Sequence, residues 1–202
     1  MSLHDYVYLT EDASHDAAIQ LINEEAFGPG RFTRAAERIR EEGPHDRRLS
    51  YICTDRGECI ASVRMTPVMA GETPAHLLGP LAVRPSHKNL GIGRDLVRIA
   101  VAAAFRAGSA AVILVGDPPY YGPLGFAPTT PGGLILPGPV DPRRVLAAVG
   151  TDMKTSDLTG VICHRLRRNG PAALLLSASA AFAKPGGTER EQHQGEAEEA
   201  RK

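Results

Sequence analysis

Two glycines and several cationic side chains gather in one short segment of this chain, between a strand-like run and a helix-like run. The segment Lys88-Asn89-Leu90-Gly91-Ile92-Gly93-Arg94 follows the apolar residues 77–83 and precedes the helix-grade residues 95–107. Amide N–H groups at the beginning of a helix have no carbonyl partner one turn earlier, and the helix dipole favours negative charge there. Because glycines let a ligand approach the backbone closely, the segment predicts a binding site for a phosphorylated ligand.

Two common phosphate-binding turns do not fit this segment. A P-loop would continue into Gly-Lys-Ser/Thr, whereas Gly93 is followed by Arg94 and Asp95. A dinucleotide-binding turn would place a third glycine where Leu96 stands. It would also belong to a parallel sheet, and the strands that precede this segment favour an antiparallel one.

The antiparallel pattern comes from three consecutive strands that lead into the glycine turn. Residues 49–54 and 59–68 are rich in apolar and β-branched side chains and are separated by the turn-like residues 55–58. A second turn at residues 70–72 precedes the third strand, which ends at Val83. The sequence therefore predicts a meander that delivers the chain to the phosphate-binding turn.

Shorter elements follow the helix expected over residues 95–107. The continuous apolar run 110–115 is typical of a strand buried on both faces. Leu134 to Leu136 predicts a short strand, Pro142 predicts a helix that runs to about Val149, and residues 160–166 predict a last strand.

Two motifs in this order resemble one known family. Leu81-Ala82-Val83-Arg84-Pro85, three residues, and then Asn89 to Arg94 resemble the acetyl-coenzyme A signature of the GNAT superfamily of N-acetyltransferases, in its small, single-domain bacterial form. The family motif is Gln/Arg-x-x-Gly-x-Gly/Ala, and Lys88 stands at its first position here. Tyr121-Gly122-Pro123-Leu124-Gly125-Phe126 resembles the Tyr-x-x-x-Gly-Phe segment that follows the fifth strand in many members. The resemblance extends over roughly residues 5 to 167.

The resemblance implies an α/β fold with a mixed, mostly antiparallel sheet of six to seven strands, flanked by helices. Its fourth and fifth strands splay apart, and acetyl-coenzyme A binds in the cleft between them. The pantetheine arm would then pair with the main chain of Leu81, Ala82 and Val83. The pyrophosphate would bind at the turn, formed by Lys88, Asn89, Leu90, Gly91, Ile92, Gly93 and Arg94. No metal is implied, and no pair of histidines has metal-ligand spacing.

The resemblance also implies the chemistry, which is direct attack of a primary amine on the thioester without a covalent enzyme intermediate. Tyr121 would act as general acid toward the departing thiolate, because a phenol with a pKa near ~10 keeps its proton at neutral pH. No single residue is identified as the base, since Glu24, Glu25, His76 and Asp117 are all available by type. The alternative function is a non-catalytic acyl-coenzyme A-binding sensor or interaction module.

Composition limits the partners of this chain. Its 202 residues include 23 basic and 23 acidic side chains, so no general charge favours nucleic acid or an anionic membrane. No apolar run approaches the ~18 residues of a membrane span, and the beginning of the chain lacks a signal-peptide pattern. The three cysteines are typical of reduced thiols, so we expect a cytoplasmic protein.

We expect the acceptor to be a small-molecule or peptide amine, and a homodimer is one assembly open to the chain. A deep acidic pocket would favour small cationic amines, and an open groove would favour peptides. We expect the acyltransferase domain to cover residues 1–168. Residues 169–202 form a C-terminal extension, which from its composition is largely disordered after residue 185.

Overall fold

One mixed sheet organises the computed structural model, which describes residues 5–28 and 35–168. The main path of the sheet has the order β1-β2-β3-β4-β5-β8-β6, while β9 pairs with β3 and β7 pairs with β9. The strands are β1 (Tyr6–Thr10), β2 (Tyr51–Asp55), β3 (Glu58–Ala70), β4 (Thr73–Val83), β5 (Ala111–Val115), β6 (Ala127–Pro128), β7 (Leu134–Ile135), β8 (Val145–Val149) and β9 (Gly160–His164). Along the main path only β4 and β5 are parallel among the described strands, which confirms the predicted mixed, mostly antiparallel sheet.

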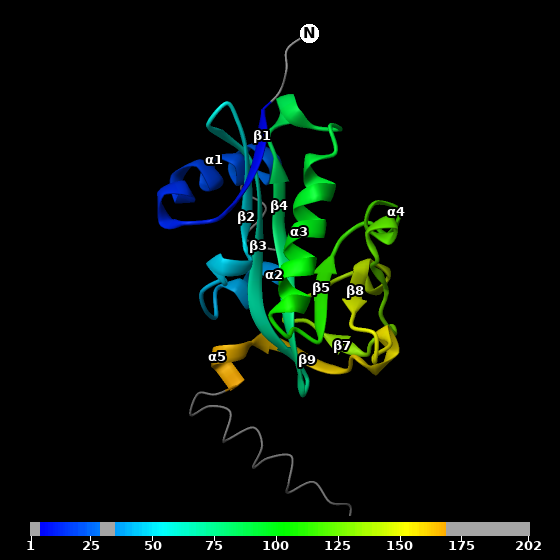
Figure 1. The fold of residues 1–202 in the computed structure, drawn as a ribbon. Helices are drawn as coiled ribbons and strands as arrows, with labels where there is room; N and C mark the ends of the chain where they lie inside the picture. The colour runs from blue at the N-terminus through cyan, green and yellow to red at the C-terminus, as the bar shows by residue number, and fades with distance from the viewer. Residues whose placement is uncertain (1–4, 29–34, 169–202) are drawn as a thin grey trace, which may run out of the picture.

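Helices cover both faces of this sheet. They are α1 (Asp16–Phe27), α2 (Ala35–Arg40), α3 (Ile92–Arg106), α4 (Pro118–Tyr121) and α5 (Arg165–Arg168). Figure 1 shows α3 in front of the sheet and α2 behind the sheet. No helix in the described ranges is long and apolar enough to cross a membrane.

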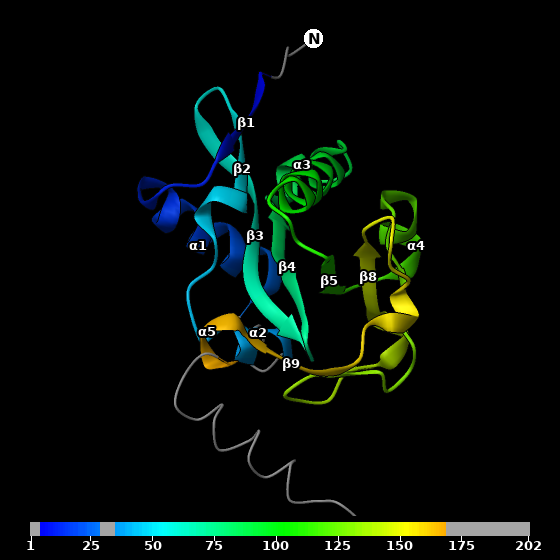
Figure 2. The same ribbon diagram turned by 60° about the horizontal axis from the view of Figure 1, so that its bottom comes forward.

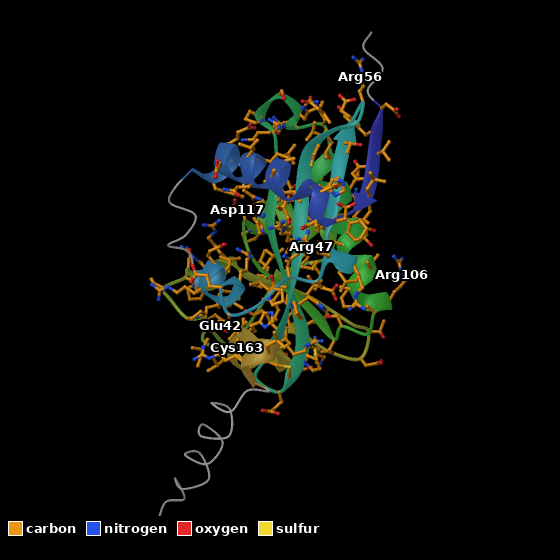
Figure 3. All side chains as sticks on the ribbon, turned by 90° about the vertical axis from the view of Figure 1, so that its left-hand side faces the viewer. Glu42, Arg47, Arg56, Arg106, Asp117 and Cys163 are labelled. Atoms are coloured by element: carbon orange, nitrogen blue, oxygen red, sulfur yellow. The ribbon has the colours of Figure 1, made fainter. Side chains whose placement is uncertain are left out.

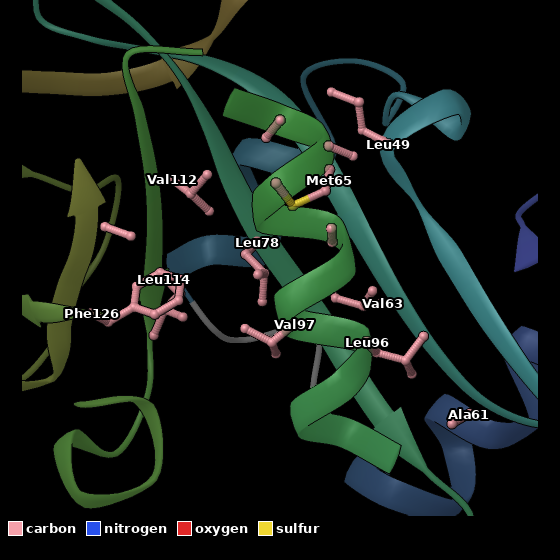
Figure 4. Packing of buried hydrophobic residues seen from close by; sticks show 14 of the residues in the cluster. Leu49, Ala61, Val63, Met65, Leu78, Leu96, Val97, Val112, Leu114 and Phe126 are labelled. Carbon is pink, nitrogen blue, oxygen red and sulfur yellow. The ribbon is translucent and has the colours of Figure 1, made fainter. Parts of the chain in front are cut away.

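The alternation of side chains along the central strands builds two apolar cores, one on each face. On β4, Leu78 packs with the α3 cluster, and its neighbour Leu77 packs with the α2 cluster. On β5, Val112 and Leu114 face α3, and Ile113 faces the opposite side. Strands buried on both faces need apolar side chains at every position, as their sequences show. Figure 4 shows α3 seated on the first of these cores.

Strands β4 and β5 are joined along only a short part of their length. Their parallel register pairs Ala75 to Leu77 with Ala111 to Ile113 and ends there. Beyond Leu77, β4 continues to Val83 without β5, while β5 stays paired along its whole length with β8 on its other side. This confirms the predicted splay, which can be followed in Figure 2.

A β-bulge lies on β4 where it leaves β5. The β3–β4 register pairs Met65 with Leu78 and Val63 with Leu81, so Arg64 lies opposite the two residues Gly79 and Pro80. Gly79 has a φ of 122°, which favours glycine, and Pro80 has no amide hydrogen to give to a neighbouring strand. These two residues therefore change the course of β4 at the point where the sheet opens.

Two predicted boundaries differ from the structure. The helix expected from Pro142 to Val149 is wrong, because Val145–Val149 is strand β8, which pairs with every residue of β5. This segment lies between β5 and β6 in the sheet, and its pairing with them outweighs the helix preference of its alanines. Helix α3 begins at Ile92, earlier than expected, because Gly91 caps it with a φ of 87°. The predicted C-terminal extension, 169–202, lies outside the described residues.

Replacing Leu96 with alanine is expected to lower the free energy of unfolding by about 2–5 kcal/mol, because this α3 side chain is fully buried against the sheet. The matched variant Leu21→Ala truncates a side chain on α1 that is 54% exposed and should cost less than about 1 kcal/mol. Chemical denaturation followed by circular dichroism measures both values. Equal losses in the two variants would contradict the packing of α3 described above.

Candidate functional site

A cavity of about 520 Å³ lies between the end of β4 and the beginning of α3. Its wall includes the turn from Lys88 to Arg94, the last residues of β4, and Phe27 at the end of α1. Tyr120, on α4, closes it from the side of β5. The cavity therefore lies where the end of β4, the beginning of α3 and α4 meet.

The turn before α3 brings its backbone to the wall of this cavity. Asn89 and Gly91 have φ values of 65° and 87°, and alternation of left-handed with other conformations turns successive N–H groups toward one point. No atom lies within 4 Å of the place where a Cβ on Gly91 would stand. Since α3 has 15 residues, its N-terminus adds a favourable dipole for an anion. Lys88 and Arg94 line the same cavity and supply positive charge.

Tyr120 lies over the second glycine of the turn. A Cβ on Gly93 would come within 2.7 Å of the Tyr120 hydroxyl oxygen, so only glycine permits this approach. The guanidinium carbon of Arg94 lies 5.8 Å from the centre of the Tyr120 ring, within the range of a cation–π contact. Burial raises the pKa of the Tyr120 phenol. Tyr120 is thus part of the wall of the smaller cavity and not only a core residue.

A larger cavity, of about 940 Å³, lies at the opening between β4 and β5. It is lined by residues of α1, α2, β3 and β4, by the segment 43–47, and by the end of β5. Phe27 and Leu81 line both cavities, so the two adjoin where β4 leaves β5. Arg47 and Asp117, labelled in Figure 3, are both in the wall of the larger one.

Tyr121 lies in the wall of the larger cavity. Its ring packs over Gly116, where an added Cβ would come within 2.3 Å of the ring. The ring also makes edge-to-face contacts, with its centroid 4.8 Å from that of Tyr120 and 5.8 Å from that of Phe126. Its hydroxyl has no hydrogen bond to any residue in the described ranges. Burial raises the pKa of Tyr121 to about 12, so the phenol keeps its proton at neutral pH.

A buried carboxylate organises the opposite wall. The Glu11 side chain is fully buried and accepts hydrogen bonds from Arg64 at 2.7 Å, Arg47 at 2.9 Å and His45 at 2.8 Å. Asp16 accepts from both guanidiniums, at 2.8 Å from Arg64 and 2.7 Å from Arg47. Burial opposes ionisation of Glu11, but the hydrogen bonds from His45 and Arg64 outweigh it, so the pKa of this carboxyl lies below its usual value.

The walls of the larger cavity are polar but not acidic. Arg40 pairs with Glu37 at 2.8 Å, and Arg144 pairs with Asp117 at 3.1 Å. Together with the cluster around Glu11, these pairs balance positive and negative charge around the cavity. Two further residues of the wall, Asn23 and Thr66, bury side-chain oxygens that have no hydrogen-bond partner among the described residues.

The structure places the predicted cofactor-binding residues around the smaller cavity. Its wall contains nearly all of them, namely Leu81, Ala82, Val83, Lys88, Asn89, Gly91, Ile92, Gly93 and Arg94. Leu90 is not in this wall, and its side chain is 51% exposed. Within the described ranges, no group of three or more His, Cys, Asp or Glu side chains is arranged so that it could hold a metal ion.

The four groups named from the sequence as possible bases lie in different places. Asp117 lines the larger cavity, and Glu24, Glu25 and His76 are not in the wall of either cavity. Glu25 pairs with Arg84 at 2.7 Å. His76 is buried, forms a hydrogen bond with Ser109 at 2.9 Å, and has its pKa lowered by burial to about 4.

Sequence reasoning did not find the cluster around Glu11. Its members come from the end of β1, α1, the loop 43–47 and β3, and no motif links them. One signal in the sequence pointed to it, namely polar residues that alternate with apolar ones along β3. This alternation places Arg64 and Thr66 on the face opposite Val63 and Met65. The sequence does not show which residues lie over that face.

Comparison with known proteins agrees with this arrangement. Residues 9–122 match the acetyltransferase (GNAT) family. A relative from Escherichia coli (strain K12), named "Uncharacterized N-acetyltransferase YjhQ", is 26% identical over 132 residues, which are 63% of this chain and 73% of the relative.

Two solved structures share the fold. The GNAT family N-acetyltransferase YhbS from Escherichia coli, in complex with CoA, has a TM-score of 0.69 at 22% identity, over 85% of this chain and 96% of its own. A GNAT family acetyltransferase from Brucella melitensis, in complex with acetyl-CoA, has a TM-score of 0.58 at 22% identity, over 81% and 97% of the two chains.

Replacing Glu11 with glutamine is expected to lower the free energy of unfolding by about 1–3 kcal/mol near neutral pH, because two partly exposed guanidiniums lose this carboxylate and keep only Asp16. A carboxyl whose pKa is lower in the folded state stabilises the fold above its unfolded pKa, ~4.3. That contribution is lost as the pH falls through the folded pKa. The difference between wild type and variant should therefore shrink below about pH 4.5.

Urea denaturation at a series of pH values measures this difference. Glu58→Gln is the matched control, because Glu58 is exposed at the beginning of β3 and its variant should change stability little at any pH. A difference for Glu11→Gln that stays constant to about pH 3 would contradict the ionised, hydrogen-bonded state of Glu11.

Proposed function

This chain belongs to the acetyltransferase (GNAT) family, and on that premise we propose that it transfers the acetyl group of acetyl-coenzyme A directly to a primary amine, with Tyr121 as general acid. The observation that carries the proposal is the junction of the two cavities at Phe27 and Leu81. One cavity ends at a phosphate-binding turn, and the other holds a protonated phenol. An acyl donor in the first would place its reactive end beside the second.

The smaller cavity has the groups that a coenzyme A molecule requires. Backbone amides from Asn89 to Gly93, with Lys88 and Arg94, would hold the pyrophosphate. The edge of β4 from Leu81 to Val83 has lost β5 as a neighbour, so its main-chain groups are available to the amides of the pantetheine arm. Tyr120 would cover the ligand from α4. The relatives YhbS and the Brucella melitensis protein, solved with CoA and acetyl-CoA, support this assignment.

Tyr121 is suited to protonate the departing thiolate. Its raised pKa keeps it protonated at neutral pH, and its hydroxyl has no competing hydrogen bond among the described residues. Gly116 and Phe126 fix the ring, because both pack against it. Positioning of the two substrates would supply the rest of the rate enhancement.

The acceptor is a small-molecule or peptide amine that carries further hydrogen-bonding groups. The charges of the larger cavity are balanced in ion pairs, so its wall does not attract polycations as an acidic pocket would. The buried oxygens of Asn23 and Thr66 would gain partners from a polar ligand. The sequence had left an acidic pocket and an open groove as alternatives, and the charge balance argues against the first.

Replacing Gly91 with valine is expected to weaken acetyl-coenzyme A binding by at least about tenfold, because the side chain would project into the anion site. Gly108→Val is a close control. Gly108 also has a positive φ, 82°, and open space at its Cβ position, but it follows the far end of α3. Isothermal titration calorimetry measures both affinities. Equal affinity in the two variants would contradict the placement of the pyrophosphate.

Replacing Tyr121 with phenylalanine is expected to lower kcat about 10²–10⁴-fold with little change in acetyl-coenzyme A affinity, because the variant keeps the ring and removes the proton donor. Release of free coenzyme A measures turnover, with spermidine, glucosamine, L-lysine and an alanine-terminated peptide as amines. Tyr51→Phe, in β2 outside both cavity walls, is the control and should keep the wild-type rate.

Two results would overturn the proposal in different ways. Tight binding of acetyl-coenzyme A without turnover of any amine would favour the non-catalytic binding module. Undiminished turnover in Tyr121→Phe would leave the transferase intact but remove Tyr121 as its general acid.

A further inference from the structure

We propose that His45, held by the buried carboxylate of Glu11, is the general base that accepts a proton from the acceptor amine. This inference rests on the acyl transfer proposed above and adds the group that the sequence left unassigned. Among the described histidines, His45 is the one in the wall of the larger cavity.

The hydrogen bond with Glu11 decides which nitrogen of His45 is the basic one. Nε2 lies 2.8 Å from Glu11 Oε1. An ionised carboxylate can only accept, so Nε2 carries the hydrogen and the lone pair of the neutral ring is on Nδ1. Nδ1 has no hydrogen bond to any residue in the described ranges.

Glu11 can fix the ring because it is itself held firmly. Arg64 binds both of its oxygens, with Nε at 3.1 and 3.0 Å and Nη2 at 2.7 Å. Arg47 adds a bond of 2.9 Å to the oxygen that His45 also contacts. A carboxylate that orients an imidazole through one nitrogen, leaving the other for the reactant, is the arrangement that general-base histidines require.

His45 and the part of β4 beside which the thioester would lie belong to the wall of one cavity. Arg64 is opposite Gly79 and Pro80 across the β3–β4 ladder, and neighbouring strands are only ~4.8 Å apart. Gly79 and Leu81 line the same cavity as His45. An amine bound in this cavity would lie between this part of β4 and His45, and its proton would pass to Nδ1 directly or through water.

The charges that face His45 from the packed elements are balanced. Glu11 and Asp16 carry negative charge, and Arg47 and Arg64 carry positive charge. The remaining guanidinium–carboxylate pairs of the wall, Arg40 with Glu37 and Arg144 with Asp117, add no net charge. A neutral imidazole whose second nitrogen keeps its lone pair is suited to accept a proton from an amine.

The proton balance of the transfer is closed by these two side chains. Nδ1 takes one proton from the acceptor ammonium, and the neutral amine nitrogen then forms its bond to the acyl carbon. As the carbon–sulfur bond breaks, Tyr121 gives its proton to the sulfur. The nitrogen of the former amine then gives its second proton to the Tyr121 phenolate, which restores the phenol. The proton on His45 passes to solvent. The net products are the amide, coenzyme A with its thiol, and one released proton.

His45→Gln separates a base from a structural partner, because the glutamine amide can still donate to Glu11. We expect kcat, at saturating acetyl-coenzyme A and amine, to fall about 10²–10⁴-fold, with acetyl-coenzyme A affinity and thermal unfolding unchanged. Wild-type kcat should decline at acid pH, where a base that must accept a proton is already protonated, and the variant should lack this decline. His15→Gln is the matched control, because His15 also contacts a carboxylate, Asp12, but lies outside both cavity walls.

The amine is the member of the panel above that wild type acetylates fastest. Retention of the wild-type rate and of its acid limb in His45→Gln would overturn the base assignment and leave the transferase and Tyr121 standing. An enzyme that acetylates no amine would instead overturn the proposed function, and the base assignment with it. As a second readout, ¹⁵N NMR of the acetyl-coenzyme A complex at about pH 7.5 should show His45 protonated on Nε2 alone. A doubly protonated ring would also overturn the assignment.

Discussion

The separation of β4 from β5 after Leu77 is the constraint on which the rest of this structure depends. A sheet that stayed paired to its edge would leave no room between these strands and no unused main-chain groups along β4. Here β5 satisfies its backbone on the other side with β8, so it can leave β4 without losing its place in the sheet. Gly79 and Pro80 turn β4 away at the same level. Both cavities exist because of this opening.

The two tyrosines that follow β5 show how closely the halves of the site are joined. They are consecutive in the chain, yet Tyr120 covers the glycine turn and Tyr121 faces the larger cavity. Each is permitted by a glycine, since a Cβ on Gly93 would strike Tyr120 and one on Gly116 would strike Tyr121. Glycine therefore has two functions here. It allows the left-handed backbone of the turn before α3, and it makes room for the aromatic rings that line the two cavities.

The other wall depends on electrostatics. A carboxylate as buried as Glu11 would be costly alone, and its hydrogen bonds from two guanidiniums and an imidazole offset that cost. The same bonds tie the end of β1, the beginning of α1, the loop 43–47 and β3 into one wall. In this GNAT family member the wall of the larger cavity is thus shaped by a charge network, whereas the wall of the smaller cavity is shaped by backbone.

The sequence by itself determined the parts of the protein that are local in the chain. The glycine turn, the meander before it and the Tyr-x-x-x-Gly-Phe segment are contiguous, and their backbone requirements appear directly as residue types. Only the tertiary structure decided that Val145–Val149 is a strand, because its pairing with β5 outweighs its local preference. Only the tertiary structure brought Glu11, His45 and Arg64 together, because they come from segments far apart in the sequence and meet through long-range hydrogen bonds. Local conformational rules can be recognised along a chain, but a buried ion network is specified only when the chain has folded around it.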